Sequence, residues 1–123
     1  MKPLFLCYPK CSTCQKAKKF LAENQIDVEE RHIVEDHPHK DELVKWMNLY
    51  QGDAKKFFNT SGLVYRDMAL KDKVKTMTPD QMAEVLAANG MLVKRPLVIL
   101  ADTVLIGFKK EQWQAVLLTD KQD

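Results

Sequence analysis

Apolar residues follow two different spacings along the first part of the chain. A short apolar run over residues 2–9 ends at a proline and predicts a buried strand. Residues 12–26 then repeat apolar side chains at helical spacing, with Ser12 or Thr13 as the N-cap. The loose alternation over residues 27–34 predicts a second strand. Strand, helix and strand in this order predict a βαβ unit with a right-handed crossover.

The middle of the chain has helical patterns and no strand candidate. Residues 40–52 carry apolar side chains three and four positions apart, and Gly52 ends the pattern. Residues 78–90 begin with a threonine cap followed by a proline in the first turn, and they end at Gly90. Shorter helical segments lie between these two helices. We therefore predict a helical insert at about residues 39–90.

The last third of the chain returns to a sheet pattern. Residues 95–100 and 103–108 are apolar runs separated by Ala-Asp, which predicts a hairpin. Residues 109–118 place their apolar side chains on one side and predict a closing helix. The order β-α-β, helices, β-β-α predicts an α/β fold with a mixed four-stranded sheet, formed by a single domain over residues 1–123.

Composition and charge exclude several classes of function. The chain has 123 residues, of which 46% are hydrophobic and 29% charged, as in an ordinary globular domain. Its net charge of +2 is too balanced to indicate nucleic-acid binding. The apolar start is too short for a signal peptide, and no run approaches the length of a membrane span. We therefore expect a cytoplasmic protein that contacts neither nucleic acid nor membrane.

The three cysteines of the chain, Cys7, Cys11 and Cys14, lie within eight residues. Cys11 and Cys14 form a CxxC where the first strand gives way to the first helix. Free N–H groups and the partial positive charge of a helix N-terminus favour a thiolate at Cys11. Cys14 lies one turn further and is placed to resolve a mixed disulfide. A CxxC beside a βαβ pattern in a cytosolic protein is typical of a thioredoxin-like redox motif.

Pro96 supports the same interpretation. It stands at the start of a predicted strand, where a proline is tolerated. In thioredoxin-like folds a cis-proline begins the corresponding strand and faces the CxxC. The cis form of an X–Pro bond costs little free energy. We therefore predict a cis bond between Arg95 and Pro96.

A metal site is the competing interpretation of the cysteine cluster. CxxxCxxC resembles the iron–sulfur loop of radical SAM enzymes, and three thiolates with His32, His37 or His39 would suit zinc. However, the chain is much shorter than a radical SAM domain and has no Gly-rich SAM-binding segment. The His-Pro-His segment has the pattern of a surface break. We therefore expect no metal, and we expect Cys7 to be a buried bystander, with a third redox thiol as the alternative.

Three segments together resemble one known family: YPKCSTCQKAKKFL, FFNTSG…YR and VKRPLVI…VLIGF. They are similar to the arsenate reductase and Spx/MgsR-related family over about residues 4–117. The resemblance implies a thioredoxin/glutaredoxin-like fold with a helical insert, as the patterns also predict. In the reductases a single cysteine attacks arsenate, and the resemblance places Cys11 at that position.

The resemblance also identifies departures from the reductases. Their anion site uses three arginines, and Arg95 matches the one before the family proline. The other two fall near Asn59 and Gly107, where this chain has no arginine, although Arg66 is a candidate to compensate. Cys7 stands where the family has a histidine. These departures argue against arsenate as the substrate.

The resemblance leaves two functions open. Spx-type proteins use the CxxC as a redox switch and bind the C-terminal domain of the RNA polymerase α subunit, with a glycine near Gly52 in that contact. The other function is a thiol–disulfide oxidoreductase acting on a thiol or disulfide partner or a small oxyanion. Its reductant would be thioredoxin or glutathione with glutaredoxin. The predicted site residues are Cys11 as nucleophile, Cys14 as resolving thiol and Arg95 as a fixed positive charge, supported by Ser12, Thr13 and Pro96.

Overall fold

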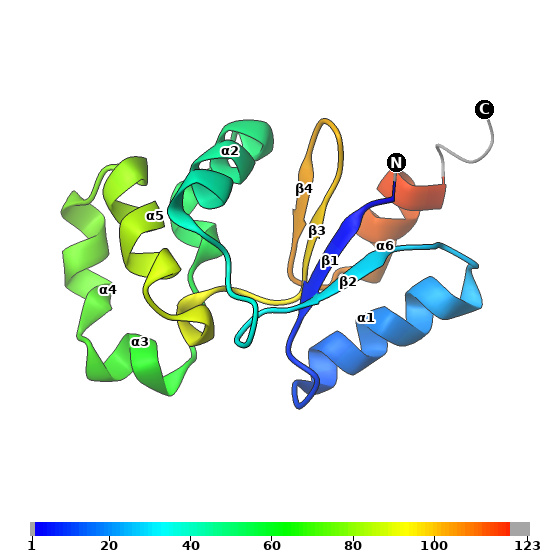
Figure 1. Cartoon of the computed structure of the whole chain (residues 1–123), viewed down its shortest axis with the longest axis horizontal. Coiled ribbons are helices and arrows are strands. Elements are labelled where there is room, and N and C mark those ends of the chain that lie inside the picture. The colour runs from blue at the N-terminus through cyan, green and yellow to red at the C-terminus, as the bar shows by residue number, and fades with distance from the viewer. Residues whose placement is uncertain (1, 119–123) are drawn as a thin grey trace.

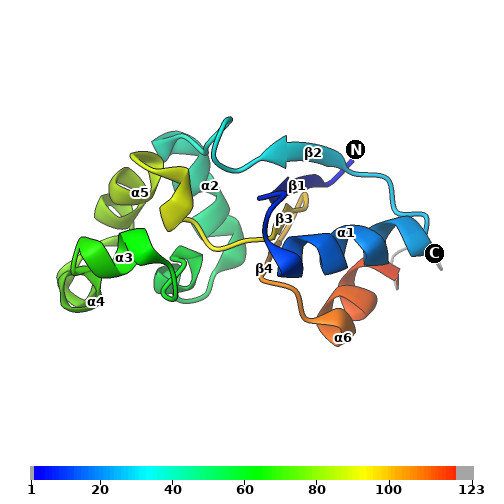
Figure 2. The same ribbon diagram turned by 90° about the horizontal axis from the view of Figure 1, so that it is seen from below.

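The computed structural model describes residues 2–118, in which helices cover both faces of a mixed four-stranded sheet (Figures 1 and 2). The strands are β1 (Leu4–Cys7), β2 (Glu29–His32), β3 (Leu97–Ile99) and β4 (Val104–Ile106). Their order is β2-β1-β3-β4. β1 pairs in parallel with β2, and β3 is antiparallel to both β1 and β4. The predicted sheet, including the C-terminal hairpin, is confirmed. The division into a single domain stays a prediction, and Met1 and residues 119–123 lie outside the described part.

One face of the sheet is covered by the first and last helices (Figure 2). They are α1 (Ser12–Glu23) and α6 (Lys110–Trp113), which continues as a π-helical turn, η4 (Gln114–Leu118). Side chains of the strands alternate between the two faces because their period is two residues. Phe5, Val98 and Leu105 pack with these helices around Trp113, which is fully buried.

The opposite face is covered by the helical insert, residues 40–92. Its elements are α2 (Lys40–Tyr50), η1 (Ala54–Phe57), α3 (Leu63–Asp67), α4 (Leu70–Lys73), η2 (Val74–Thr76), α5 (Pro79–Ala87) and η3 (Gly90–Leu92). Leu6, Leu97 and Val104 pack into its core with side chains of α2 and α5. Among the described residues between β2 and β3, the only sheet-like pairing is an isolated bridge between Phe58 and Val93. The prediction of a helical insert is therefore confirmed.

Two predicted helix ends were wrong. α2 ends at Tyr50, and Gln51 instead of Gly52 adopts the left-handed conformation that stops it, with φ of 59°. α5 begins at the predicted Thr78 cap but ends at Ala87, before Gly90. Gly90 does not end the helix. It allows a close approach to the backbone oxygen of Ile33, which leaves no room for a Cβ at this position.

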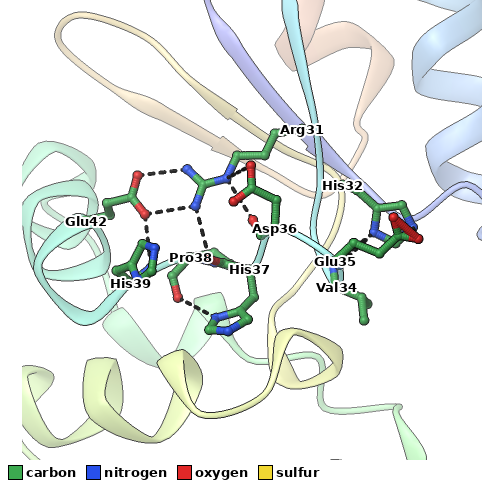
Figure 3. A network of polar contacts seen from close by, with 9 residues as sticks. All are labelled: Arg31, His32, Val34, Glu35, Asp36, His37, Pro38, His39 and Glu42. Atoms are coloured by element: carbon green, nitrogen blue, oxygen red, sulfur yellow. Dashed lines mark hydrogen bonds and ion pairs between the residues drawn. The ribbon is translucent and has the colours of Figure 1, made fainter.

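A bidentate ion pair joins β2 to the start of α2 (Figure 3). Nη1 and Nη2 of Arg31 donate to the two carboxylate oxygens of Glu42 at 2.8 and 2.9 Å. The same guanidinium donates to the backbone oxygens of Asp36 and His37. Glu42 also accepts a hydrogen bond from the N–H of His39, at the N-terminus of α2. These bonds fix the chain where it leaves the sheet and enters the insert.

Replacing Glu42 with glutamine should lower stability at neutral pH. The hydrogen bonds from Arg31 lower the pKa of Glu42 to about 2, from an ordinary value of 4.5. Its stabilising contribution is therefore complete above about pH 4.5 and is lost as the pH falls towards 2. We expect Glu42→Gln to reduce the free energy of unfolding by about 2 kcal/mol at pH 7, because Glu42 is partly exposed and solvent screens part of the full shift.

Urea unfolding of the wild type and the variant from pH 7 down to pH 3 measures this difference. Glu84→Gln is the matched control, because Glu84 makes an exposed ion pair with Lys40 at 3.6 Å and should change stability by less than about 0.5 kcal/mol. If the difference in unfolding free energy between the wild type and Glu42→Gln stayed constant from pH 7 to pH 3, the lowered pKa assigned to Glu42 would be wrong.

Candidate functional site

The CxxC lies at the junction between β1 and α1 (Figure 1). Cys11 is the N-cap of α1, with an extended backbone (φ −86°, ψ 124°). Its N–H donates to Tyr8 O at 2.9 Å and closes the turn that leads out of the strand. The predicted cap at Ser12 or Thr13 was therefore wrong, since this turn starts the helix one residue earlier. Both residues lie exposed in the first helical turn.

Cys11 opens into a groove between the N-terminus of α1 and the helical insert. The groove has a volume of about 510 Å³. Its lining residues are Cys11, Thr13, Asn59, Ser61, Gly62, Leu63, Val64, Met91, Lys94 and Arg95. Cys11 is half-buried, whereas Cys7 and Cys14 are buried. Of the three cysteines, Cys11 is thus the one placed to meet a substrate from this side.

Arg95 forms one wall of the groove and is firmly held. Its Nη1 donates to the backbone oxygens of Met91 and Val93 at 3.1 and 3.3 Å. Its Cζ lies 5.4 Å from the centroid of the Tyr8 ring, a cation–π distance. The bond between Arg95 and Pro96 is cis, as predicted. The guanidinium is therefore a fixed positive charge beside the CxxC.

Cys14 is buried behind Cys11, with 2% of its surface exposed. The neighbouring Cys7 side chain lowers the pKa of Cys14 most, and the N–H of Tyr8, donating to Cys14 Sγ at 3.3 Å, lowers it further. The Cys11 thiol and the positive charge of Arg95 act in the same direction. Burial opposes them, and the net result is a pKa of about 6, below the ordinary value of 9.0. These contacts therefore favour the thiolate of Cys14.

The surroundings of Cys7 favour its neutral thiol, in contrast to those of Cys14. It is 3% exposed, and its S–H donates to Oε1 of Glu30 at 3.3 Å. The interaction with the Cys14 side chain, burial, and the hydrogen bond and negative charge of Glu30 all raise the pKa of the Cys7 thiol. Cys7 is buried, as predicted. Its contacts with the sulfur of Cys14 and with Glu30 were not visible in the sequence, since they depend on how β1, β2 and α1 come together.

The positions that carry arginines in the reductases also meet at this end of the molecule. Asn59 lines the Cys11 groove. Gly107 is buried with a positive φ of 73°, and its N–H donates to Pro96 O at 2.9 Å. A Cβ built at Gly107 would lie 3.6 Å from Cε of Lys94. Lys94 therefore provides a cation near the place of the missing arginine, whereas Arg66 is exposed on α3 and does not line the groove.

Sequence reasoning missed Lys94. The available signal was its position directly before the Arg-Pro pair, which the fold places beside the CxxC. A second cavity, of about 420 Å³, shares Lys94 with the Cys11 groove and is also lined by Lys55, Lys56 and Lys109. The surface next to Cys11 is therefore basic.

The histidines of the zinc alternative are used elsewhere (Figure 3). Nδ1 of His32 accepts hydrogen bonds from the N–H groups of Val34 and Glu35. His37 lies beside Pro38 O, and His39 is the N-cap of α2. Within residues 2–118, no three His, Cys, Asp or Glu side chains are grouped so that they could hold a metal ion. In the same part of the chain, none of the helices has the length and apolar character needed to cross a membrane.

Comparisons with known proteins agree with this geometry. The ArsC family model matches residues 6–116. The protein YusI of Bacillus subtilis (strain 168) is 46% identical over 114 residues, which cover 93% of this chain and 97% of YusI. A crystal structure described as ArsC family related, from Bacteroides fragilis, is 54% identical, with a TM-score of 0.89 and coverage of 94% and 97%.

A transcriptional regulator is among the relatives. The global transcriptional regulator Spx of Streptococcus agalactiae serotype V is 26% identical over 120 residues, which cover 98% of this chain and 85% of Spx. The ArsC family model nevertheless matches almost the whole sheet, α1 and the insert. The chain therefore belongs to the ArsC family.

Proposed function

We propose that this protein is a thiol–disulfide redox protein in which Cys11 attacks the substrate and Cys14 resolves the adduct. Membership in the ArsC family and the Spx relative support a thiol redox role. The observation that carries the finer proposal is the arrangement of the two sulfurs. Cys11 lines an open groove, and Cys14 is buried one helical turn further along α1, where the N–H of Tyr8 donates to its sulfur.

The reaction proceeds in two exchange steps. Cys11, after losing its proton to solvent, attacks a sulfur of the substrate disulfide as a thiolate, and the other substrate sulfur leaves as a thiolate with the electron pair of the broken bond. The thiolate of Cys14 then attacks Cys11 Sγ, forms the Cys11–Cys14 disulfide and releases the second substrate sulfur as a thiolate. The contacts that lower the pKa of Cys14 favour the thiolate that this second step requires.

The charge of the groove favours an anionic substrate. Lys94 and Arg95 flank Cys11, and the adjoining cavity adds three more lysines. A glutathione adduct carries carboxylates that complement these cations. An arsenate site is less well supported, because Arg95 is the only one of the three reductase arginines that this chain retains. In the cytoplasm, thioredoxin or glutathione with glutaredoxin would reduce the Cys11–Cys14 disulfide and complete the cycle.

Replacing Cys14 with serine should trap the mixed disulfide. We expect the wild type treated with glutathione disulfide to end as an intramolecular Cys11–Cys14 disulfide. In Cys14→Ser the resolving thiolate is gone, so one glutathione should remain on Cys11. Intact-mass and peptide mass spectrometry measure both products. A Cys14→Ser protein without glutathione on Cys11, under conditions that oxidise the wild type, would contradict the proposal.

A redox-gated regulator is the second candidate function. It is favoured by the Spx relative, which matches almost the whole chain. In this case the dithiol senses the redox state, and the protein binds the C-terminal domain of the RNA polymerase α subunit. A pull-down with that domain, using fully reduced and fully oxidised protein, tests it. Binding in one redox state supports the regulator, and no binding in either state removes it.

A further inference from the structure

A second cavity beside the groove of Cys11 is strongly basic. It has a volume of about 420 Å³ and is lined by η1 of the insert and by the segment that joins β4 to α6. Four of its lining residues are lysines, and we call it the lysine cavity: Lys55, Lys56, Lys94 and Lys109. No aspartate or glutamate of residues 2–118 lines this cavity or the groove. Adjoining hollows that carry charge of one sign attract ligands of the opposite sign.

The charges of these four lysines are available to a ligand. Lys94 is half-buried, and the other three are exposed. In the part of the chain that the structure describes, the ion pairs of lysine involve other positions, which are Lys2, Lys18, Lys40 and Lys75. The carboxylate of Asp53 lies nearby, but it caps η1 and accepts from the backbone N–H of Lys55 at 3.0 Å. Four ammonium groups around one cavity repel one another, and a bound anion would relieve this repulsion.

Lys94 connects the lysine cavity to the reacting cysteine. It lines both hollows, and Arg95 follows it in the groove of Cys11. The groove has a volume of about 510 Å³, which is within the range that one small ligand fills. A substrate whose disulfide meets Cys11 therefore reaches the other three lysines only if its chain continues past Lys94. The lysine cavity is thus placed for a part of the substrate that lies outside the groove.

Apolar side chains accompany these charges. Leu63, which lines the groove, is 69% exposed. Phe58 and Ile106 line the lysine cavity. A polypeptide presents apolar side chains and carboxylates along one chain, and it also carries the disulfide with which Cys11 reacts. A nucleic acid presents phosphates but no disulfide. The combination of groups therefore favours an acidic polypeptide as the occupant.

We propose that the lysine cavity docks an acidic segment of a polypeptide substrate whose disulfide is reduced at Cys11. This inference rests on the proposed function, because it names the substrate class of the Cys11–Cys14 pair. The chemistry is the two-step exchange described above. Two electrons pass from the sulfurs of Cys11 and Cys14 to the substrate disulfide, which leaves as two thiolates, and the Cys11–Cys14 disulfide remains. Docking strengthens the encounter and takes no part in the exchange of bonds.

Replacing the three lysines that lie outside the groove tests the proposal. The docking variant combines Lys55→Gln, Lys56→Gln and Lys109→Gln. The control variant combines Lys16→Gln, Lys19→Gln and Lys71→Gln. The three control lysines are exposed and line neither hollow, so the control gives the same change in net charge at other places. Circular dichroism and thermal unfolding verify that both variants are folded.

Two synthetic peptides of equal length, each closed by one disulfide, serve as substrates. One carries several glutamates beside its disulfide, and the other carries glutamines at the same positions. Glutathione disulfide is the third substrate. The rate at which each substrate forms the Cys11–Cys14 disulfide is measured by mass spectrometry of acid-quenched samples at low ionic strength.

We expect the wild type to react about tenfold faster with the glutamate peptide than with the glutamine peptide. The docking variant should lose most of this preference, and the control variant should keep it. If the control variant lost the preference to the same extent, net charge and not the cavity would be responsible. If the docking variant lost as much rate with glutathione disulfide as with the glutamate peptide, the cavity would serve a small substrate and the proposal would be wrong.

A binding measurement separates this proposal from the proposed function. In a Cys11→Ser background, fluorescence anisotropy measures the affinity for a labelled glutamate peptide with serines in place of its cysteines. Weaker binding after the docking substitutions would support the docking site, even if the wild type showed no disulfide exchange. Exchange without lysine-dependent binding would keep the proposed function and overturn the docking site. Tighter binding of random-sequence duplex DNA at the same ionic strength would assign the cavity to nucleic acid and would also overturn the proposal.

Discussion

Replacing Cys11 with serine is expected to slow the reaction of this protein with glutathione disulfide by about a thousandfold or more. The reason is access. Cys11 lines the open groove, whereas Cys7 and Cys14 are 3% and 2% exposed. Cys14 remains in the variant, but its burial keeps its sulfur from a disulfide that enters the groove. Ionisation alone does not make a thiol reactive.

Time-resolved mass spectrometry after mixing with glutathione disulfide measures this rate. Cys14→Ser is the matched control, because it keeps Cys11 and should still take up glutathione. Circular dichroism and thermal unfolding verify that both variants are folded. If Cys11→Ser formed glutathione adducts on Cys14 at a rate near that of the wild type, then Cys14 would be the attacking sulfur and the proposed roles would have to be exchanged.

Replacing Gly90 with alanine is expected to destabilise the protein by about 3 kcal/mol, the largest effect on stability that we predict. Gly90 is buried at the start of η3, where the insert returns towards β3. A Cβ there would overlap Ile33 O and would lie 2.9 Å from Cα of Val34. Both are backbone atoms, so the segment after β2 would have to move.

Urea unfolding at neutral pH measures the loss. Gly52→Ala is the matched control, since Gly52 is exposed and a Cβ there meets at 2.6 Å only Cε2 of the Tyr50 ring, a side-chain atom that can shift more easily than backbone. We expect the control to change stability by less than about 1 kcal/mol. If Gly90→Ala and Gly52→Ala reduced the free energy of unfolding equally, the close approach of Gly90 to the backbone of Ile33 and Val34 would not be important for stability.

Short-range patterns predicted most of the fold. Apolar runs located three of the strands and a loose alternation located β2, and Thr78 was recognised as the cap of α5 because a cap is encoded within a few residues. The errors lie where tertiary contacts decide. Cys11 became the N-cap of α1 because its N–H bonds back to Tyr8, and Gln51 ended α2 in place of a glycine one residue later. The preferences of cysteine and glutamine for helix ends predict neither of these two features.

The candidate site was predictable only where its residues belong to short-range sequence motifs. Cys11, Cys14 and the Arg-Pro pair belong to local motifs, and the structure brings Arg95 to the groove of Cys11. The partners of Cys7 were not predictable, because the contact with Glu30 depends on the parallel register that sets Phe5 opposite Glu30. The insert's contribution to the groove, including Asn59, depends on how it packs against the sheet.

Disulfide mapping of the wild-type protein across a glutathione redox series tests the central claim most directly. Peptide mass spectrometry at each potential identifies which sulfurs are joined. We predict a Cys11–Cys14 disulfide with a midpoint in the cytosolic range, about −220 to −320 mV, and a free Cys7 throughout. Absence of a Cys11–Cys14 bond at every potential would contradict the assignment of these two cysteines as a redox pair.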